Sequence, residues 1–168
     1  MIEKLSGIEK LLGVVILLTA TAAAAAADND SPDSPFTLLV GPYVYHYSDN
    51  AKHNNEPRLV GLEWRPQGSW VDFGASYFRN SFYQDSFYAY VGKRWFMGEH
   101  DQGLFLRLTG GPLYGYRGQY EDKVPYNHHG LGIAIIPGIG YHYRACEAQF
   151  VILGTAALMV TFGYDFQR

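Results

Sequence analysis

Residues Tyr77 to Trp95 have the sequence "YFRNSFYQDSFYAYVGKRW". Bulky residues alternate with small or polar ones on both sides of a short polar bend, a pattern typical of a β-hairpin with one apolar face. The bend carries side chains that are capable of chemistry, namely Arg79, Asn80, Ser81, Gln84, Asp85 and Ser86. The stretch therefore predicts a β-sheet protein with reactive groups at one of its turns.

The same alternation, interrupted by turn residues, continues along the rest of the chain after residue 35. It predicts strands over residues 36–47, 58–65, 70–80, 86–96, 102–118, 130–143, 148–154 and 156–166. Short turns alternate with longer polar loops, as in the smallest up-and-down barrels of the outer membrane. We therefore predict an all-β, eight-stranded antiparallel up-and-down transmembrane β-barrel over residues 36–168.

The N-terminal region has the pattern of an export signal. Lys4 and Lys10 precede the apolar run "LLGVVILL", which is followed by an alanine-rich stretch and by "DNDSPDSP". We predict a signal peptide over residues 1–27 and a short N-terminal segment over 28–35. The alternative is an alanine-rich helix of the mature protein. The apolar run is too short for a membrane-spanning helix, which needs about 20 residues.

Composition excludes several classes of function. The formal net charge is -3 and no basic stripe is present, so we expect no nucleic-acid partner. Cys146 is the single cysteine, which excludes an intramolecular disulfide, a CxxC redox pair and a thiolate zinc cluster. We expect no cofactor and no metal, because the adjacent His128 and His129 point in different directions from a loop.

The apolar faces of the strands favour lipid as their surroundings. The chain is 16% aromatic with 14 Tyr, which is typical of a membrane barrel with aromatic girdles. Bulky side chains share one face at Tyr43, Tyr45 and Tyr47, and apolar ones share one face at Phe87, Ala89 and Val91. A soluble lipocalin-like barrel is the alternative, but its outer face would be polar.

The direction of the strands predicts which residues meet. If the N-terminus lies on the periplasmic side, the first, third and fifth strands end at the cell surface, so that His46, Asn80 and Ser81 share one rim with the loop that holds His128 and His129. The period of two directs His46 into the barrel with Val44, and Gly92 with Tyr90. An inward glycine leaves space for one acyl chain.

Three segments carry a resemblance to a known family: "YVYHYSD", "NNEPRLVGLEW" and "FRNSFYQDSFYAYVGKRW". Together they resemble the PagP-type lipid A palmitoyltransferases over about fifty residues, from Pro42 to Trp95. The family's histidine falls on His46, its Asp-Ser pair on Asn80 and Ser81, and its hydrocarbon-ruler glycine on Gly92. Asn80 departs from the aspartate of the well-known members, so a role that needs a carboxylate is lost. The prolines of the family fall on Pro42 and Pro57 and, more loosely, on Pro125 and Pro137.

The resemblance implies an enzyme of the Gram-negative outer membrane that moves a palmitoyl chain from the sn-1 position of a phospholipid to lipid A. His46 would act as the general base. Asn80 would hold the imidazole or donate to the oxyanion, and Ser81 would orient the donor or act as a nucleophile. Gly92 would be the floor of the acyl pocket and the four prolines would open lateral access for lipids. We expect a monomer.

Other readings of the same residues remain open. An outer-membrane lipid hydrolase, either a lipid A deacylase or a phospholipase, would use the same groups with Glu63 as a possible third member. A non-enzymatic small barrel, such as an adhesin or a small transporter, would need none of them, since Asn80 and Ser81 are also common turn residues.

Overall fold

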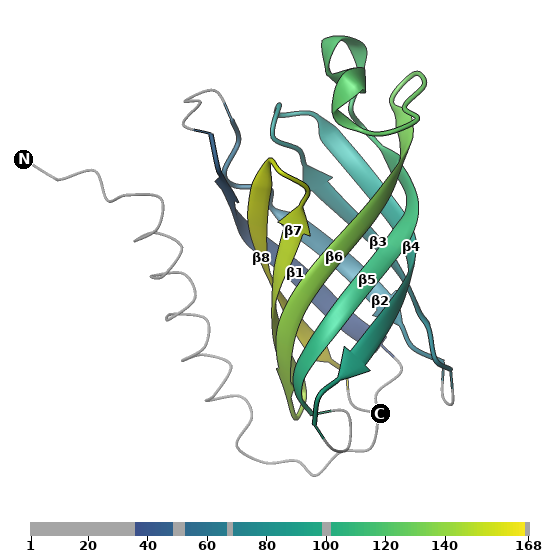
Figure 1. Ribbon diagram of the computed structural model, residues 1–168, viewed down its shortest axis with the longest axis vertical. Helices are drawn as coiled ribbons and strands as arrows, with labels where there is room; N and C mark the ends of the chain where they lie inside the picture. Colours follow the sequence, from purple (N-terminus) through teal and green to yellow (C-terminus); the bar gives the residue numbers. More distant parts are fainter. Residues whose placement is uncertain (1–35, 49–52, 67–68, 99–101, 167–168) are drawn as a thin grey trace, which may run out of the picture.

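The computed structural model describes residues 36–48, 53–66, 69–98 and 102–166. They form a closed antiparallel barrel in which each strand pairs with its neighbours in sequence and β8 pairs with β1 (Figure 1). The elements are β1 (Phe36–His46), β2 (Leu59–Trp64), β3 (Asp72–Arg79), β4 (Asp85–Phe96), β5 (Gly103–Tyr114), η1 (Gly118–Lys123), β6 (Leu131–Tyr143), β7 (Cys146–Leu153) and β8 (Ala157–Asp165). The predicted eight-stranded up-and-down barrel is confirmed, while the predicted signal peptide (1–27) and the N-terminal segment (28–35) lie outside the described residues.

The alternation of the hairpin predicted its two faces correctly. In β4, Tyr88, Tyr90 and Gly92 are buried, whereas Phe87 and Val91 are exposed. The strand pairs with β3 in a regular register from Asp72↔Gly92 to Arg79↔Asp85. Because side chains alternate between the two sides of a strand, this register sends one polar and aromatic row into the barrel and one apolar row outward.

Two of the differences between predicted and observed strand boundaries have a clear local reason. β5 ends at Tyr114, because Gly115 has a φ of 132° and its amide N–H donates to the carbonyl of Gly130 instead of continuing a straight strand. β7 begins at Cys146, because the turn before it consists only of Arg144 and Ala145. Arg144 has a φ of 55°, which two-residue hairpin turns require.

A β-bulge interrupts the alternation in β1. The register between β1 and β8 shifts between Val40 and Tyr43, and Pro42 lies within this shift. Thr37, Leu39 and Gly41 are buried before the shift and Val44 after it. After the shift Val44 pairs with Met159, which lines the interior, whereas Tyr43 pairs with Val160, so Tyr43 lies on the outer side as predicted although it is only 8% exposed. Such bulges bend the strand and re-aim its side chains.

The barrel carries its apolar residues outside and many of its polar residues inside. Exposed apolar side chains occur on all eight strands, although on β8 only Tyr164 is exposed. Examples on the other strands are Val40, Leu62, Phe73, Val91, Leu106, Ile135 and Phe150. Buried polar side chains include Thr37, Ser76, Thr109, Gln149 and Thr161. In the part of the chain that the structure describes, no helix is both long enough and apolar enough to cross a bilayer.

Charged side chains close the barrel interior at the end away from the His46 side. Arg94 contacts Glu63, Asp72 and Glu147, and Arg107 contacts Glu63 and Asp72. We call these five residues the ion-pair cluster. The side chains are almost fully buried, so their charges need partners inside the barrel. Each guanidinium contacts more than one carboxylate.

Candidate functional site

The site lies where β1 and β3 end, at a rim that we call the His46 rim. The imidazole Nε2 of His46 lies 2.8 Å from the hydroxyl oxygen of Ser81. The two residues are 35 positions apart in sequence and come from the ends of odd-numbered strands. The contact therefore confirms that these two predicted site residues share one rim.

The short strand β2 leaves room between the ends of β1 and β3. Pairing between β1 and β2 runs only from Phe36↔Trp64 to Gly41↔Leu59, so the last residues of β1 extend beyond it. Residues of the β1–β2 loop pack against the end of β1 where β2 no longer pairs with it. The amide of Val44 donates to the carbonyl of Asn55, and the amide of Asn54 donates to the carbonyl of Ser81, each at 2.9 Å.

Asn54 fixes this loop against the end of β3. Its side chain is 6% exposed, and its amide nitrogen lies 3.2 Å from both the carbonyl of Arg79 and the carbonyl of Asn80. Its side-chain oxygen accepts from the amide of Glu56 at 3.0 Å. The carbonyl of Pro57 accepts from the amide of Arg79 at 2.7 Å. The loop is thus bonded to both strands that carry the site.

Asn55 is the second partner of the His46 ring. Its side-chain oxygen lies 2.9 Å from Nδ1, on the opposite side of the ring from Ser81. Because an amide oxygen only accepts, Nδ1 carries the proton and Nε2 has a free lone pair. That lone pair accepts the hydroxyl proton of Ser81.

Tyr116 lies near Ser81 in the lining of a cavity at this rim, and burial raises the pKa of Tyr116 to about 12. The phenol therefore stays protonated at physiological pH and remains a donor. His53 stacks beside His46 with ring centroids 4.6 Å apart, and Phe82 packs edge-on against His53.

Asn80 serves the turn between β3 and β4. Its side-chain oxygen accepts from the amides of Phe82 and Gln84 at 2.9 and 3.0 Å, and its nitrogen donates to the carbonyl of Gly115 at 3.3 Å. The residue is 2% exposed. The expected contact with the imidazole is made by Asn55 instead, and Asn80 acts by shaping the turn that presents Ser81.

A cavity of about 440 Å³ opens beside His46 and Ser81, and we call it the mouth cavity. It is lined by Ala134 and Ile136 of β6 and also by Ile133 and Ile135, which lie on the exposed face of that strand. Because residues from both faces of β6 line one cavity, the cavity reaches through the barrel wall. Ile152 and Leu153 of β7 line its other side.

The gap in the wall follows from the pairing of β6 with β7. Their register begins at Gly138↔Val151 and runs away from the His46 rim to Tyr143↔Cys146. Pro137 is the next residue of β6 beyond the last pair and has no amide N–H to donate. The part of β6 nearest the rim therefore has β5 as its strand partner and leaves its β7 side open.

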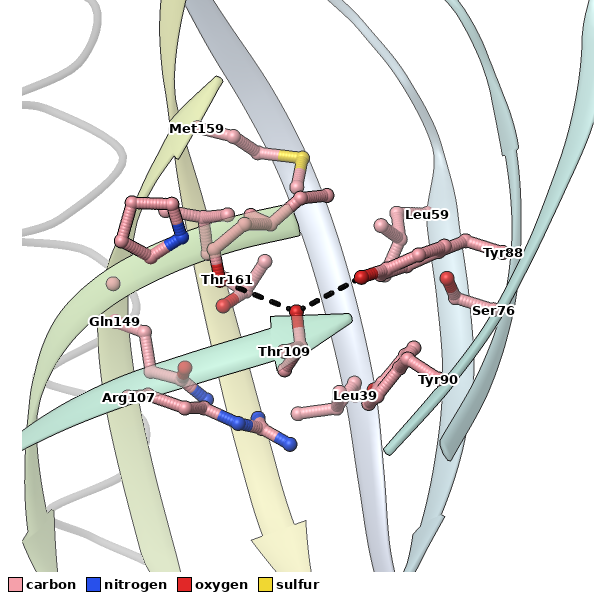
Figure 2. A pocket seen from close by; sticks show the side chains of 14 residues that line it. Leu39, Leu59, Ser76, Tyr88, Tyr90, Arg107, Thr109, Gln149, Met159 and Thr161 are labelled. Carbon is pink, nitrogen blue, oxygen red and sulfur yellow. Dashed lines mark hydrogen bonds between the residues drawn. The ribbon is translucent and has the colours of Figure 1, made fainter. Parts of the chain in front are cut away.

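A smaller cavity of about 60 Å³, the inner cavity, lies deeper in the barrel, and Ile136 lines both cavities. Figure 2 shows Met159 and Leu59 at one end of it and Arg107, Gln149 and Tyr90 at the other. The hydroxyls of Tyr88 and Thr109 lie 3.1 Å apart across it. The inner cavity is thus mostly apolar and ends on residues that contact or belong to the ion-pair cluster.

Gly92 lies below this end rather than on it. Among the described residues, those of β4 that line the inner cavity are Tyr88 and Tyr90. Gly92 pairs with Asp72, and a β-carbon added at Gly92 would overlap the Asp72 carboxylate. Gly92 is therefore not part of the cavity lining, and Tyr90 is the residue of β4 at the inner end of the cavity.

The prolines predicted to give lateral access have different surroundings. Pro42 lies in the bulge between β1 and β8, and Pro57 is buried in the β1–β2 loop. Pro125 lines the mouth cavity, and its carbonyl accepts from the amide of Ile133 at 3.0 Å. Pro137 alone adjoins the gap between β6 and β7.

Other candidate residues lie elsewhere in the barrel. Glu63, the possible third member of a hydrolase site, belongs to the ion-pair cluster. The rings of His128 and His129 lie 4.1 Å apart on the β5–β6 connection, which rises above one end of the barrel in Figure 1.

No protein-family model matches the chain, and no curated protein sequence matches it significantly. Sequence reasoning missed Asn55 and Tyr116. The segment "NNEP" was visible as part of the resemblance, but the contact of Asn55 depends on bonds between the loop and two distant strands.

Proposed function

We propose that this protein is an outer-membrane acyltransferase that moves a palmitoyl chain from the sn-1 position of a phospholipid to lipid A. The observation that carries the proposal is the hydrogen bond between His46 and Ser81 at the edge of a cavity that opens through the barrel wall. The His46 imidazole, which can activate a hydroxyl group, thus lies beside a cavity whose aliphatic lining suits a lipid chain.

The distribution of polarity supports insertion into a membrane. The outward faces of the strands are apolar, and the charged side chains of the ion-pair cluster lie inside. In a soluble protein such an extended apolar surface is unusual, whereas in a membrane barrel the lipid-facing band is apolar and the interior polar. Antiparallel closure satisfies the backbone groups that would otherwise face hydrocarbon.

The mouth cavity supports an acyl chain as the ligand. Its volume of about 440 Å³ falls in the range of about 300 to 1,000 Å³ that small-molecule sites occupy. Its lining is dominated by aliphatic side chains such as Leu113, Val124, Ile136 and Leu153. A chain that enters between β6 and β7 would bury its methylenes there and hold its ester near Ser81.

The chemistry follows from the tautomer of His46. With a free lone pair on Nε2, the imidazole accepts a proton from a hydroxyl group that attacks the donor ester. Exclusion of water by the aliphatic lining favours a lipid hydroxyl over hydrolysis as the second substrate. Asn80 contributes by holding the turn.

A lipid hydrolase is the second candidate, and the bond between Ser81 and His46 favours it as well. Such a pair attacks an ester whether the final acceptor is a lipid hydroxyl or water. The two candidates differ only in where the acyl group goes.

The test uses the purified barrel in vesicles that contain a phospholipid with an isotopically labelled sn-1 palmitoyl chain and lipid A as acceptor. The transferase predicts labelled lipid A together with the lysophospholipid, whereas a hydrolase releases labelled free palmitate. Free palmitate at the same rate with and without lipid A would contradict the transferase.

A further inference from the structure

We infer that Ser81 is the nucleophile of the reaction and carries the acyl chain as a covalent ester, and that Asn55 is a positioning residue that holds His46 for this step. The inference deepens the proposed function and rests on it for the identity of the acyl donor. It begins from the two hydrogen bonds of the His46 ring, one with Asn55 and one with Ser81.

The direction of the proton in these bonds is fixed by Asn55. Its side-chain oxygen can only accept, so His46 donates from Nδ1 and accepts at Nε2. The only donor in the Ser81 side chain is its hydroxyl group, and the hydroxyl oxygen lies 2.8 Å from Nε2 of His46. A serine bonded to the free nitrogen of an imidazole, with the other nitrogen held by a third group, is the arrangement that activates a nucleophile.

Asn55 is held firmly enough to perform this task. Its carbonyl accepts from the amide of Val44, two residues before His46 on the same strand. The preceding Asn54 is buried and bonded to the end of β3, from which Ser81 follows. The same loop segment therefore sets the position of the imidazole relative to both its partners.

Burial keeps the nearby phenol of Tyr116 protonated, so it is available as a hydrogen-bond donor beside Ser81. Ser81 and Tyr116 both line the mouth cavity, so the attacking oxygen faces the space proposed for the ester.

Acylation proceeds as a balanced proton transfer and substitution. Ser81 Oγ attacks the sn-1 ester carbonyl while its proton passes to Nε2, and a tetrahedral intermediate forms. The bond from the carbonyl carbon to the glycerol oxygen breaks, and that oxygen takes the proton from Nε2 and leaves as the lysophospholipid. Palmitoyl-Ser81 remains and His46 is again neutral.

Deacylation reverses these roles with the second lipid. The lipid A hydroxyl gives its proton to Nε2 and attacks the carbonyl of palmitoyl-Ser81. The bond to Ser81 Oγ breaks, and the serine oxygen recovers the proton from Nε2. No oxidant, reductant or metal enters this balance.

The test is covalent labelling of the full barrel, refolded in detergent micelles, with hexadecyl fluorophosphonate. Serine attack on the phosphorus expels fluoride and leaves a stable adduct, which tandem mass spectrometry locates. We expect the adduct on Ser81, none there in Ser81→Ala, and labelling slowed about a hundredfold or more in His46→Ala, the range for loss of a general base. Ser48→Ala and His128→Ala alter exposed residues of the same types at the same rim and are expected to label normally.

Substitutions of Asn55 separate positioning from general structural support. Asn55→Leu removes the acceptor and is expected to slow labelling about tenfold, the effect of losing one neutral hydrogen bond. Asn55→Asp still accepts from Nδ1 and is expected to label close to the wild-type rate. In each variant that keeps His46 and labels, the rate should fall at low pH, as protonation of Nε2 removes the base.

The outcomes keep this inference apart from the proposed function. A barrel that palmitoylates lipid A but gives no Ser81 adduct would overturn the covalent step and leave the transferase intact. A barrel that labels at Ser81 but leaves lipid A unchanged would support the nucleophile and contradict the transferase. Equal labelling of wild type and Asn55→Leu, or loss of labelling in Asn55→Asp, would overturn the role of Asn55.

Discussion

Tyr90 donates its hydroxyl proton to the carboxylate of Glu63 at 2.6 Å, and this bond holds the phenol ring across the inner end of the apolar cavity. Gly74 makes the position possible, because a β-carbon there would overlap the Tyr90 ring. Glu63 is in turn held by Arg94 and Arg107. The ion-pair cluster therefore fixes the depth of the cavity through one aromatic side chain.

If the barrel transfers acyl chains as proposed, Tyr90→Ala is expected to make it accept longer chains. Removing the ring extends the inner cavity, and each further buried methylene contributes about 0.8 kcal/mol, or about fourfold in relative rate. The measurement is competition between phospholipids with sn-1 chains of different length, with the lipid A products separated by mass.

Two further variants make this prediction specific. Tyr90→Phe keeps the ring and should keep the chain-length preference. Gly92→Met would meet Asp72 and Thr109, so it is expected to lower stability rather than to shorten the preferred chain. Unaltered selectivity in Tyr90→Ala, or a shorter chain in a well-folded Gly92→Met, would return the floor to Gly92.

Arg94→Met is expected to destabilise the barrel by about 3 to 5 kcal/mol, because removing one partner leaves buried charges uncompensated. Glu63, Asp72 and Glu147 would then face Arg107 alone within the cluster. Urea titration of the barrel in lipid vesicles measures the change. Arg79→Met is the matched control, because its ion pair with Asp85 spans 3.9 Å and is exposed, so the loss should stay below about 1 kcal/mol. Similar losses in both variants would contradict a stabilising cluster.

Asn80 is expected to act through the turn and not through the chemistry. Asn80→Ala deprives the amides of Phe82 and Gln84 of their acceptor and should cost about 1 to 3 kcal/mol of stability. Asn80→Asp keeps both bonds but cannot donate to the carbonyl of Gly115, so it should cost less stability than Asn80→Ala and retain activity. Urea titration and the vesicle assay are run together on both variants. A stable Asn80→Asp barrel without activity would show that the amide itself is needed.

Ala134→Trp is expected to block the mouth cavity, which Ala134 lines from β6. The vesicle assay should lose lipid A product, and labelling by the hexadecyl probe should fall, while a short-chain fluorophosphonate still reaches Ser81. Ala89→Trp makes the same substitution on the exposed face of β4 and serves as control. Equal slowing of both probes would indicate damage to His46 or Ser81 and not a blocked lipid path.

The strands and the shared rim of His46 and Ser81 were predictable because both follow from local periodicity and strand direction. The place of Gly92 outside the cavity lining was not predictable. Gly92 pairs with Asp72 of β3, and the register between two strands cannot be derived from the sequence of either strand alone. The bulge at Pro42 was likewise not predictable, and it puts Gly41 and Val44, three residues apart, on the buried side of β1. Asn55 escaped prediction because its place depends on the bonds of Asn54 to residues of β3.

The most direct measurement of the central claim is mass spectrometry of lipid A from a bacterium that lacks its own palmitoyltransferase and expresses this chain. We expect a lipid A species heavier by one palmitoyl group, which is lost in His46→Ala and Ser81→Ala and kept in Ser48→Ala. Membrane insertion of each barrel is verified in the same cells. Unchanged lipid A from an inserted wild-type barrel, or lipid A lighter by an acyl chain, would contradict it.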